Sequence, residues 1–167
     1  MRKTPFDTMN CSLANALDQI GDWWTLLILR EVIIGCDRFD DIQAALGIAR
    51  NILTVRLTKL VDHGILERQA ISPGVKRTAY RLTAKGSELL PALLALMQWG
   101  DRWISGRGKE PMIAVEAATS RRLPRLVLSS ASGRPLGVAD IRFQPGPGAR
   151  PATKAHLDQF KRSRKGG

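Results

Sequence analysis

Residues 46–66 constrain the fold of this chain more than any other stretch, because a turn, a helix and a stop follow one another there. Gly47 predicts the turn, and Gly64 predicts the end of the helix. Apolar residues recur between them at helical spacing, at Ile52, Leu53, Leu57, Leu60 and Val61. One stripe of this helix must therefore be buried in a core, which leaves the opposite face exposed.

The opposite face of the predicted helix carries basic and short polar side chains, and no acidic residue occurs before Asp62. These residues are Arg50, Asn51, Thr54, Thr58 and Lys59. A helix with such a face can enter the major groove of DNA, although an ordinary amphipathic surface helix has the same pattern. Ala49 occupies the expected N-cap position, where Ser or Thr would stabilise the helix start better.

The neighbouring segments favour the DNA interpretation. Asp37 is positioned to cap a short helix over residues 39–47, which makes the pair a helix-turn-helix. Two alternating segments around residues 72–74 predict a β-hairpin after it. Lys76 and Arg77 lie beside the tip of this wing, where they would contact the DNA backbone or minor groove unless they are merely solvated. We therefore expect a mainly α (α+β) winged helix.

Residues 23–35 are apolar nearly all round, which predicts a helix at the centre of the core. Asp22 is a suitable N-cap, and Arg30 and Glu31 must find an edge or a partner. The residues expected in the centre are Trp23, Leu26, Leu27, Ile28, Leu29, Val32 and Ile33.

A long C-terminal helix is expected from a Thr83 cap to about residue 104, with a kink at Pro91. One apolar stripe contains Leu89, Leu90, Leu93, Leu94 and Met97, and a second contains Leu96, Trp99 and Trp103. Two apolar faces need two partners, so we expect this helix to form a homodimer interface. Coverage of both stripes by the C-terminal extension is the alternative.

The net charge of +11 and the pI of about 10.6 favour a polyanionic partner. Residues 48–85 carry eight basic and two acidic side chains, and residues 150–167 carry six and one. We expect the latter to be a disordered basic tail that adds nonspecific phosphate contacts. Residues 1–10 are expected to form a flexible arm.

Two features of the sequence predict a cytoplasmic protein that does not bind a membrane. The N-terminus lacks the apolar core of a secretory signal, and the longest apolar run is shorter than the roughly 20 residues of a membrane span. The two cysteines, Cys11 and Cys36, are accordingly expected as free thiols.

Several ordered motifs resemble the HxlR-type bacterial transcriptional regulators. They occupy residues 11–31, 38–42, 47–57, 80–86 and 99–100. The resemblance implies a dimeric, MarR-like winged helix over residues 11–104. It also implies that the dimer binds double-stranded DNA at inverted-repeat operators, and we expect this binding to repress transcription. Arg50, Asn51, Thr54 and their neighbours would read the operator, and Lys76 and Arg77 would contact it from the wing.

The resemblance also raises two questions of chemistry. Cys11 matches a cysteine that senses oxidants or electrophiles in some members, although a small buried side chain is the simpler interpretation. Residues 105–149 resemble a zinc-ribbon-like extension, but Ser129 and Ser132 stand where a Cys-x-x-Cys knuckle would be, and serine is a poor zinc ligand. We expect two short strands there, over residues 126–128 and 138–143, and no metal or other cofactor.

Three rival functions follow from the same residues. An enzyme is disfavoured because the two histidines, His63 and His156, belong to no recognisable catalytic motif. A winged helix used for protein contact is disfavoured by the basic balance of residues 48–85. A small-molecule effector site near Trp99 and Trp103 stays open, since aromatic residues at helical spacing form an interface more often than a pocket.

Overall fold

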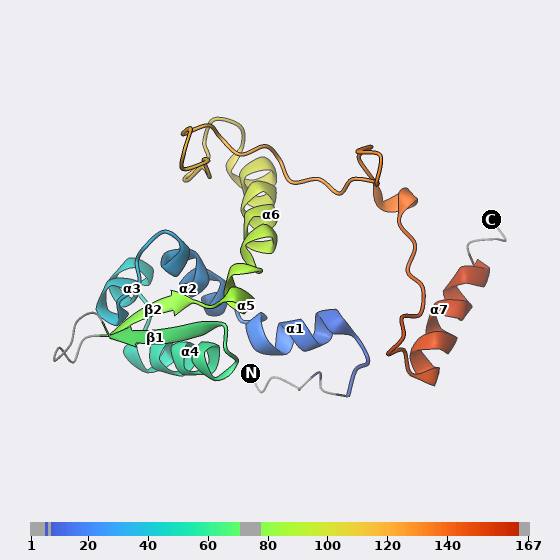
Figure 1. Ribbon diagram of the computed structural model, residues 1–167, viewed down its shortest axis with the longest axis horizontal. Coiled ribbons are helices and arrows are strands. Elements are labelled where there is room, and N and C mark those ends of the chain that lie inside the picture. The colour runs from blue at the N-terminus through green and yellow to red at the C-terminus, as the bar shows by residue number, and fades with distance from the viewer. Residues whose placement is uncertain (1–5, 7, 71–77, 164–167) are drawn as a thin grey trace. The chain divides into compact units, whose positions relative to one another are not determined.

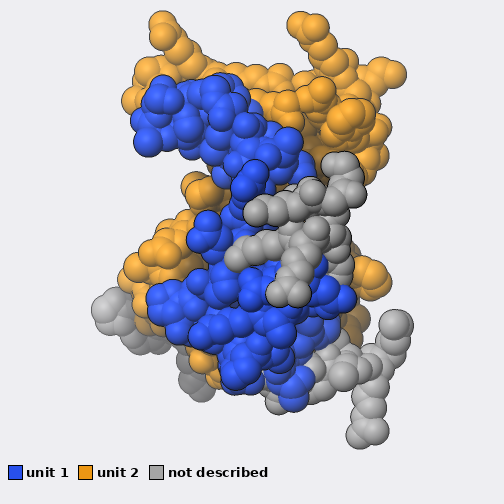
Figure 2. Space-filling model, turned by 90° about the vertical axis from the view of Figure 1, so that its right-hand side faces the viewer, with its two compact units in different colours: residues 1–18, 127–167 blue, residues 19–126 orange. Residues whose placement is uncertain are grey.

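The computed structural model describes residue 6, residues 8–70 and residues 78–163. The chain divides into two compact units (Figure 2). One contains residues 19–126, and the other combines residues 1–18 with residues 127–167. Helix α1 (Ser12–Ile20) crosses the division between them.

The larger unit is a winged helix-turn-helix, which confirms the predicted fold class (Figure 1). Three helices are followed by an antiparallel hairpin in which Leu66 pairs with Leu82 and Ala70 with Thr78. The elements, in order, are α2 (Trp23–Ile33), α3 (Phe39–Leu46), α4 (Arg50–Asp62), β1 (Leu66–Ala70) and β2 (Thr78–Leu82).

The segment before α3 extends the hairpin on its other side. Arg38 forms an isolated antiparallel bridge with Ala79, and the Tyr80 N–H donates a hydrogen bond of 2.7 Å to the Asp37 carbonyl. The sequence did not predict this pairing, because it joins residues about forty positions apart by a single bridge. It attaches the start of α3 directly to β2.

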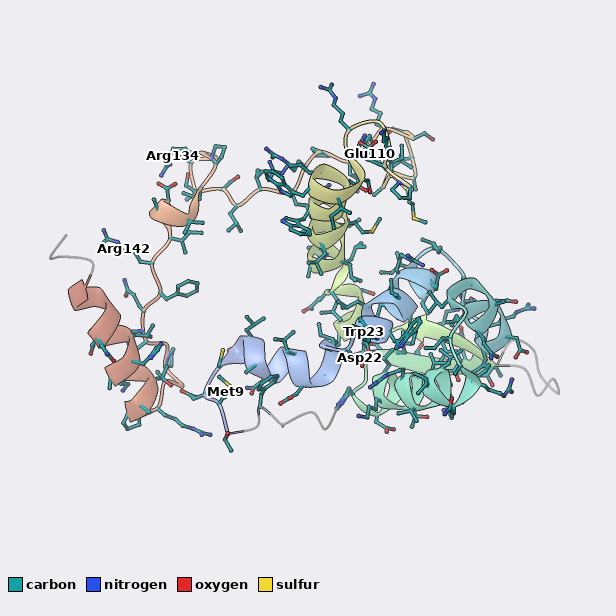
Figure 3. The ribbon with its side chains drawn as sticks, turned by 180° about the vertical axis from the view of Figure 1, so that it is seen from behind. Met9, Asp22, Trp23, Glu110, Arg134 and Arg142 are labelled. Atoms are coloured by element: carbon teal, nitrogen blue, oxygen red, sulfur yellow. The ribbon has the colours of Figure 1, made fainter. Side chains whose placement is uncertain are left out.

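Helix α2 lies at the centre of the core, as predicted, and contacts α3, α4 and β2. One apolar cluster holds the unit together, and its buried members are Ile28, Leu29, Val32, Ile42, Ile48, Leu53, Leu57, Leu60, Ile65, Leu66, Tyr80 and Leu93. Trp23 was wrongly predicted in this centre and is 76% exposed at the first position of α2 (Figure 3). When a helix is apolar on every side, its sequence does not show which positions the neighbouring elements will bury.

Charged residues near the helix starts have different roles. Asp22 caps α2 as predicted, because its carboxylate accepts the Trp24 N–H at 3.0 Å. Asp37 does not cap α3, which begins after Arg38 without a side-chain cap, and this prediction was wrong. Asp37 instead forms an ion pair with Arg81 of β2. A carboxylate beside a helix start can serve either purpose, and the tertiary neighbour decides.

Arg30 and Glu31 satisfy each other inside α2. The Arg30 guanidinium donates to the Glu31 carboxylate, which is buried. Removing Arg30 would leave the buried carboxylate of Glu31 unpaired.

The predicted continuous C-terminal helix is wrong. Thr83 caps a short helix as expected, accepting the Gly86 N–H at 3.1 Å, but that helix ends after one turn. Pro91 lies in the first turn of a new helix instead of kinking an old one, since proline lacks the N–H that an interior position needs. The elements are α5 (Ala84–Ser87), α6 (Leu90–Gly100) and a π-helical turn, η1 (Asp101–Ser105).

The turn from Thr83 to Gly86 fastens the wing to the end of α4. The Thr83 hydroxyl donates to the Gly64 carbonyl at 2.7 Å, and Lys85 Nζ donates to the His63 carbonyl at 2.8 Å. These bonds satisfy carbonyls left open at the end of the helix. Gly86 lies so close that an added Cβ would stand 2.2 Å from the Ile65 carbonyl oxygen.

The extension differs from its prediction. Neither residues 126–128 nor residues 138–143 form a strand, and Val138–Asp140 is a 3-10 turn, η2. Bridges instead pair Val115 with Arg122 in the larger unit and Ser129 with Pro135 in the smaller one. The apolar residues of the predicted strands are exposed except for the half-buried Ile141, so these segments have no packed face on which a sheet could form.

The predicted disordered tail contains a helix, α7 (Pro151–Ser163), which corrects that part of the domain assignment. Pro151 suits the first position of a helix, and Asn10 secures the entry. Asn10 Oδ1 accepts from the Arg150 N–H and from the Thr153 hydroxyl, both at 2.8 Å. Basic composition alone could not indicate this contact. Residues 1–5 and 7 of the predicted flexible arm lie outside the described residues.

Replacing Gly86 with alanine should destabilise the protein by about 1–3 kcal/mol, because the new methyl group must push the backbone of Ile65 away. Urea unfolding followed by circular dichroism measures the change. Gly146→Ala is the control, since its Cβ would meet nothing within 4 Å and its backbone is outside the left-handed region, so stability should change little. Equal stability of the Gly86 variant and the original chain would contradict the tight contact.

Candidate nucleic-acid interface

Helix α4 buries one stripe and exposes the face that the sequence predicted as the DNA-reading surface. Leu53 and Leu57 are 0% exposed and Leu60 is 1% exposed, which confirms their assignment to the core. Helix α4 contacts α2 on one side and β1 on another. The rotation of α4 about its axis is therefore determined by packing, and the residues about half a turn from this stripe face outward.

Arg50 begins the exposed face, and α3 holds its side chain. Its guanidinium lies 4.7 Å from the centre of the Phe39 ring and 3.5 Å from a carboxylate oxygen of Asp40. Both side chains of this ion pair are largely exposed, so the pair contributes little to stability. The stacking on Phe39 nevertheless limits where the guanidinium can point. Ala49 provides no side-chain cap before it, as expected.

The polar residues that follow cover the same face. Asn51, Thr54 and Lys59 are exposed, whereas Thr58 is half-buried. The Thr54 hydroxyl donates a hydrogen bond of 2.8 Å to the Arg50 carbonyl, so its oxygen is left to accept from a partner. The structure thus leaves Arg50, Asn51, Thr54 and Lys59 accessible on the part of α4 that does not enter the core.

Arg56 lies beside the core and pairs with an acid. Its guanidinium is 2.8 Å from Asp22, and about a quarter of each side chain is exposed. Asp22 therefore caps α2 with one oxygen and binds α4 with the other. This partly buried pair connects the start of α2 to the middle of α4, so Arg56 is structural.

Two exposed apolar residues on α4 were not predicted as part of the site. Val55 is 50% exposed and Ile52 is 37% exposed. Ile52 was expected on the buried stripe. The helical repeat of 100° per residue could have placed Val55 between Asn51 and Lys59, on the outward face.

The wing has the predicted hairpin, but Lys76 and Arg77 lie outside the described residues. Its described strands add exposed basic side chains that sequence reasoning missed. Arg68 of β1 lies 6.0 Å from the centre of the Tyr80 ring, and Arg81 of β2 pairs with Asp37. Alternation along the strand would not have indicated Arg68 as exposed, because residue 68 shares a face with the buried Leu66.

Helix α6 and η1 carry the exposed apolar stripe predicted as a dimer interface. Leu96 is 56% exposed, Trp99 57% and Trp103 65%, whereas Leu93 on the opposite stripe is 8% exposed. The extension is tied to α6 by Gln98. Its amide donates to the Pro124 carbonyl at 3.1 Å and accepts the Leu126 N–H at 2.8 Å. This attachment leaves the tryptophans uncovered.

The two cysteines have different surroundings. Cys11, just before α1, is exposed, and Cys36 is half-buried. Burial raises the pKa of the Cys36 thiol, and the carboxylates of Glu31, Asp41 and Asp37 raise it further. Cys36 is therefore the less reactive of the two thiols.

The described part of the chain contains neither a metal-binding cluster nor a helix long and apolar enough to cross a membrane. At the degenerate knuckle, serine hydroxyls form hydrogen bonds. Ser130 Oγ lies 3.0 Å from Ser132 Oγ and accepts the Arg134 N–H at 3.1 Å (Figure 3 labels Arg134). The knuckle turn is thus closed by these side chains. His63 is exposed at the C-cap of α4, as expected for a capping residue.

Comparison with known proteins agrees with this geometry. The family described as HxlR-like helix-turn-helix matches residues 19–107. The uncharacterised HTH-type transcriptional regulator Rv3095 of Mycobacterium tuberculosis is 38% identical over 139 residues, which are 82% of this chain and 87% of the relative.

Solved structures agree as well. PA1607, described as a candidate transcription factor, has a TM-score of 0.79 and 36% identity, covering 86% of this chain and 100% of its own. The redox regulator HypR in its reduced form has a TM-score of 0.50 and 28% identity, covering 54% of this chain and 90% of its own. The chain belongs to the HxlR-like helix-turn-helix family of transcriptional regulators.

Proposed function

We propose that two copies of this chain bind an inverted-repeat operator in double-stranded DNA and repress transcription by blocking access to it. The observation that carries this proposal is the outward face of α4, which presents Arg50, Asn51, Thr54 and Lys59 without an acidic neighbour on the helix before Asp62. Membership of a family of transcriptional regulators supports DNA as the partner.

The residues of this face have complementary roles. Arg50 and Asn51 can form paired hydrogen bonds with guanine and adenine edges respectively, and Thr54 can accept from a base amino group. Lys59 and Thr58 lie further along α4, where they would contact phosphates that fix the position of the protein. Lys76 and Arg77 would do the same from the wing, and residues 150–167 would add contacts without sequence preference.

The exposed stripe of Leu96, Trp99 and Trp103 supports a two-fold partner. A contiguous stripe of large apolar side chains seldom remains this accessible in a monomer unless another molecule covers it. A symmetric dimer would place two α4 helices about one DNA turn apart, roughly 34–36 Å. Half-sites of an inverted repeat have the same symmetry, so dimerisation and operator binding support each other.

Charge reversal at Arg50 and Lys76 tests DNA binding. Arg50→Glu with Lys76→Glu should weaken operator binding on the order of a hundredfold, since each change removes a contact and adds repulsion. Fluorescence anisotropy, on a duplex selected by the full chain from a random pool, measures the affinity. The control, Arg107→Glu with Lys109→Glu, makes the same change of net charge at exposed residues of the extension. Equal losses in both variants would contradict a specific role for α4 and the wing.

Substituting the exposed tryptophans tests the dimer. Trp99→Glu with Trp103→Glu should give a folded monomer, because charges on the apolar stripe would remain buried and unpaired in an interface. Light scattering coupled to size exclusion measures the mass, and circular dichroism checks the fold. Trp23→Glu changes another exposed tryptophan, 76% accessible, and should leave the dimer intact. A dimer that survives the double substitution would exclude this interface.

A redox response is a second candidate function, favoured by the exposure of Cys11 and by the likeness to the redox regulator HypR. Oxidation of an accessible thiol at the start of α1 would change a residue that is not part of α4, so any effect on DNA must pass through the fold.

Thiol chemistry separates the two cysteines. We expect iodoacetamide to modify Cys11 before Cys36, because burial and nearby carboxylates keep the Cys36 thiol protonated. If Cys11 is a sensor, diamide should weaken the operator footprint of the original chain and leave that of Cys11→Ser unchanged. A footprint that is insensitive to diamide would eliminate redox sensing and leave the DNA-binding proposal intact.

A further inference from the structure

The centre of the outward face of α4 is apolar. Val55 is 50% exposed, and helical geometry places Asn51 one turn before it and Lys59 one turn after it. The buried stripe of α4 is complete without Val55, since Leu53, Leu57 and Leu60 are each at most 1% exposed. The core therefore does not account for a valine at this position.

An exposed valine also gives α4 no local advantage. Its branched side chain loses rotamer freedom in a helix, so valine is a poorer helix former than alanine, lysine or glutamine. Half of its surface stays in water in the isolated chain, which withholds much of the gain from burial. A partner that covers Val55 would supply that gain.

The surroundings of Val55 identify the partner. A protein-binding helix typically presents several apolar residues three and four positions apart. On α4 only Ile52 adjoins Val55 in this way, and the other neighbouring side chains are polar or basic. In the major groove the C5-methyl group of thymine is the apolar group by which a base pair is recognised. A small apolar side chain within a polar, basic face matches that single methyl group.

We propose that Val55 contacts the C5-methyl group of a thymine in each half-site and so determines specificity at that base pair. This inference rests on the proposed reading role of α4. Asn51, one turn earlier on the same face, has the donor and acceptor that adenine requires. The two side chains together select A·T pairs at neighbouring positions of the half-site.

Deoxyuridine substitution tests the contact, because uracil differs from thymine only by the missing methyl group. The probe is the duplex selected from a random pool by the full chain, with each thymine of one half-site replaced singly by deoxyuridine. One replacement should weaken binding by the original chain about fourfold, the value expected for one lost methyl contact. The same replacement should have a smaller effect on Val55→Ala, which lacks the two γ-methyl groups and whose affinity for the unmodified duplex should already be about fourfold lower.

Val115→Ala is the matched control, since Val115 is an exposed valine outside α4 and its substitution should retain the full sensitivity to deoxyuridine. Unchanged melting temperatures would show that both variants are folded. If the original chain binds the duplex but no deoxyuridine position depends on Val55, the inference is wrong and the proposed function stands. If the original chain selects no duplex, both are wrong.

Discussion

The packing of α4 against α2 is the constraint on which the rest of the structure depends. Leu53, Leu57 and Leu60 enter the same apolar cluster as Ile28 and Leu29, and all five are almost fully buried. Because a helix rotated by one residue turns by 100°, this packing leaves little choice about which side chains face outward. The polar surface of α4 follows from the burial of the opposite stripe.

Polar contacts then secure the middle and the C-terminal end of α4. Asp22 caps the central helix and pairs with Arg56 in the middle of α4, so one carboxylate links two helices. Beyond its end, Thr83 and Lys85 donate to the carbonyls of Gly64 and His63, while Gly86 permits the close approach. Residues 83–86 therefore attach the wing to the C-terminal end of α4. A surface on a helix held in this way loses little conformational freedom when it binds a rigid partner.

The outward surface of α4 carries side chains of different chemical types, and its charged side chains are only weakly held. Arg50 is stacked on Phe39 and paired with Asp40, but both members of the ion pair are solvent-accessible, so a phosphate or a base could replace the carboxylate at small cost. Val55 adds an apolar centre to a face that is otherwise polar and basic. Such a mixture suits recognition of base edges better than simple attraction to phosphate does.

The sequence by itself determined the winged helix-turn-helix, because helical spacing, glycine stops and strand alternation act over a few residues. It also determined the Asp22 and Thr83 caps and the burial of Leu53, Leu57 and Leu60 in α4, all confirmed, whereas Ile52 of the predicted stripe is exposed. Only the tertiary structure decided that Arg56 forms an ion pair with Asp22 and that Asp37 forms one with Arg81. It also decided that α5 and α6 are separate helices and that Asn10 forms hydrogen bonds at the start of α7. These outcomes depend on neighbours distant in sequence, or on which of two allowed roles a residue takes. Local pattern cannot choose between them, because the choice is made by the free energy of packing.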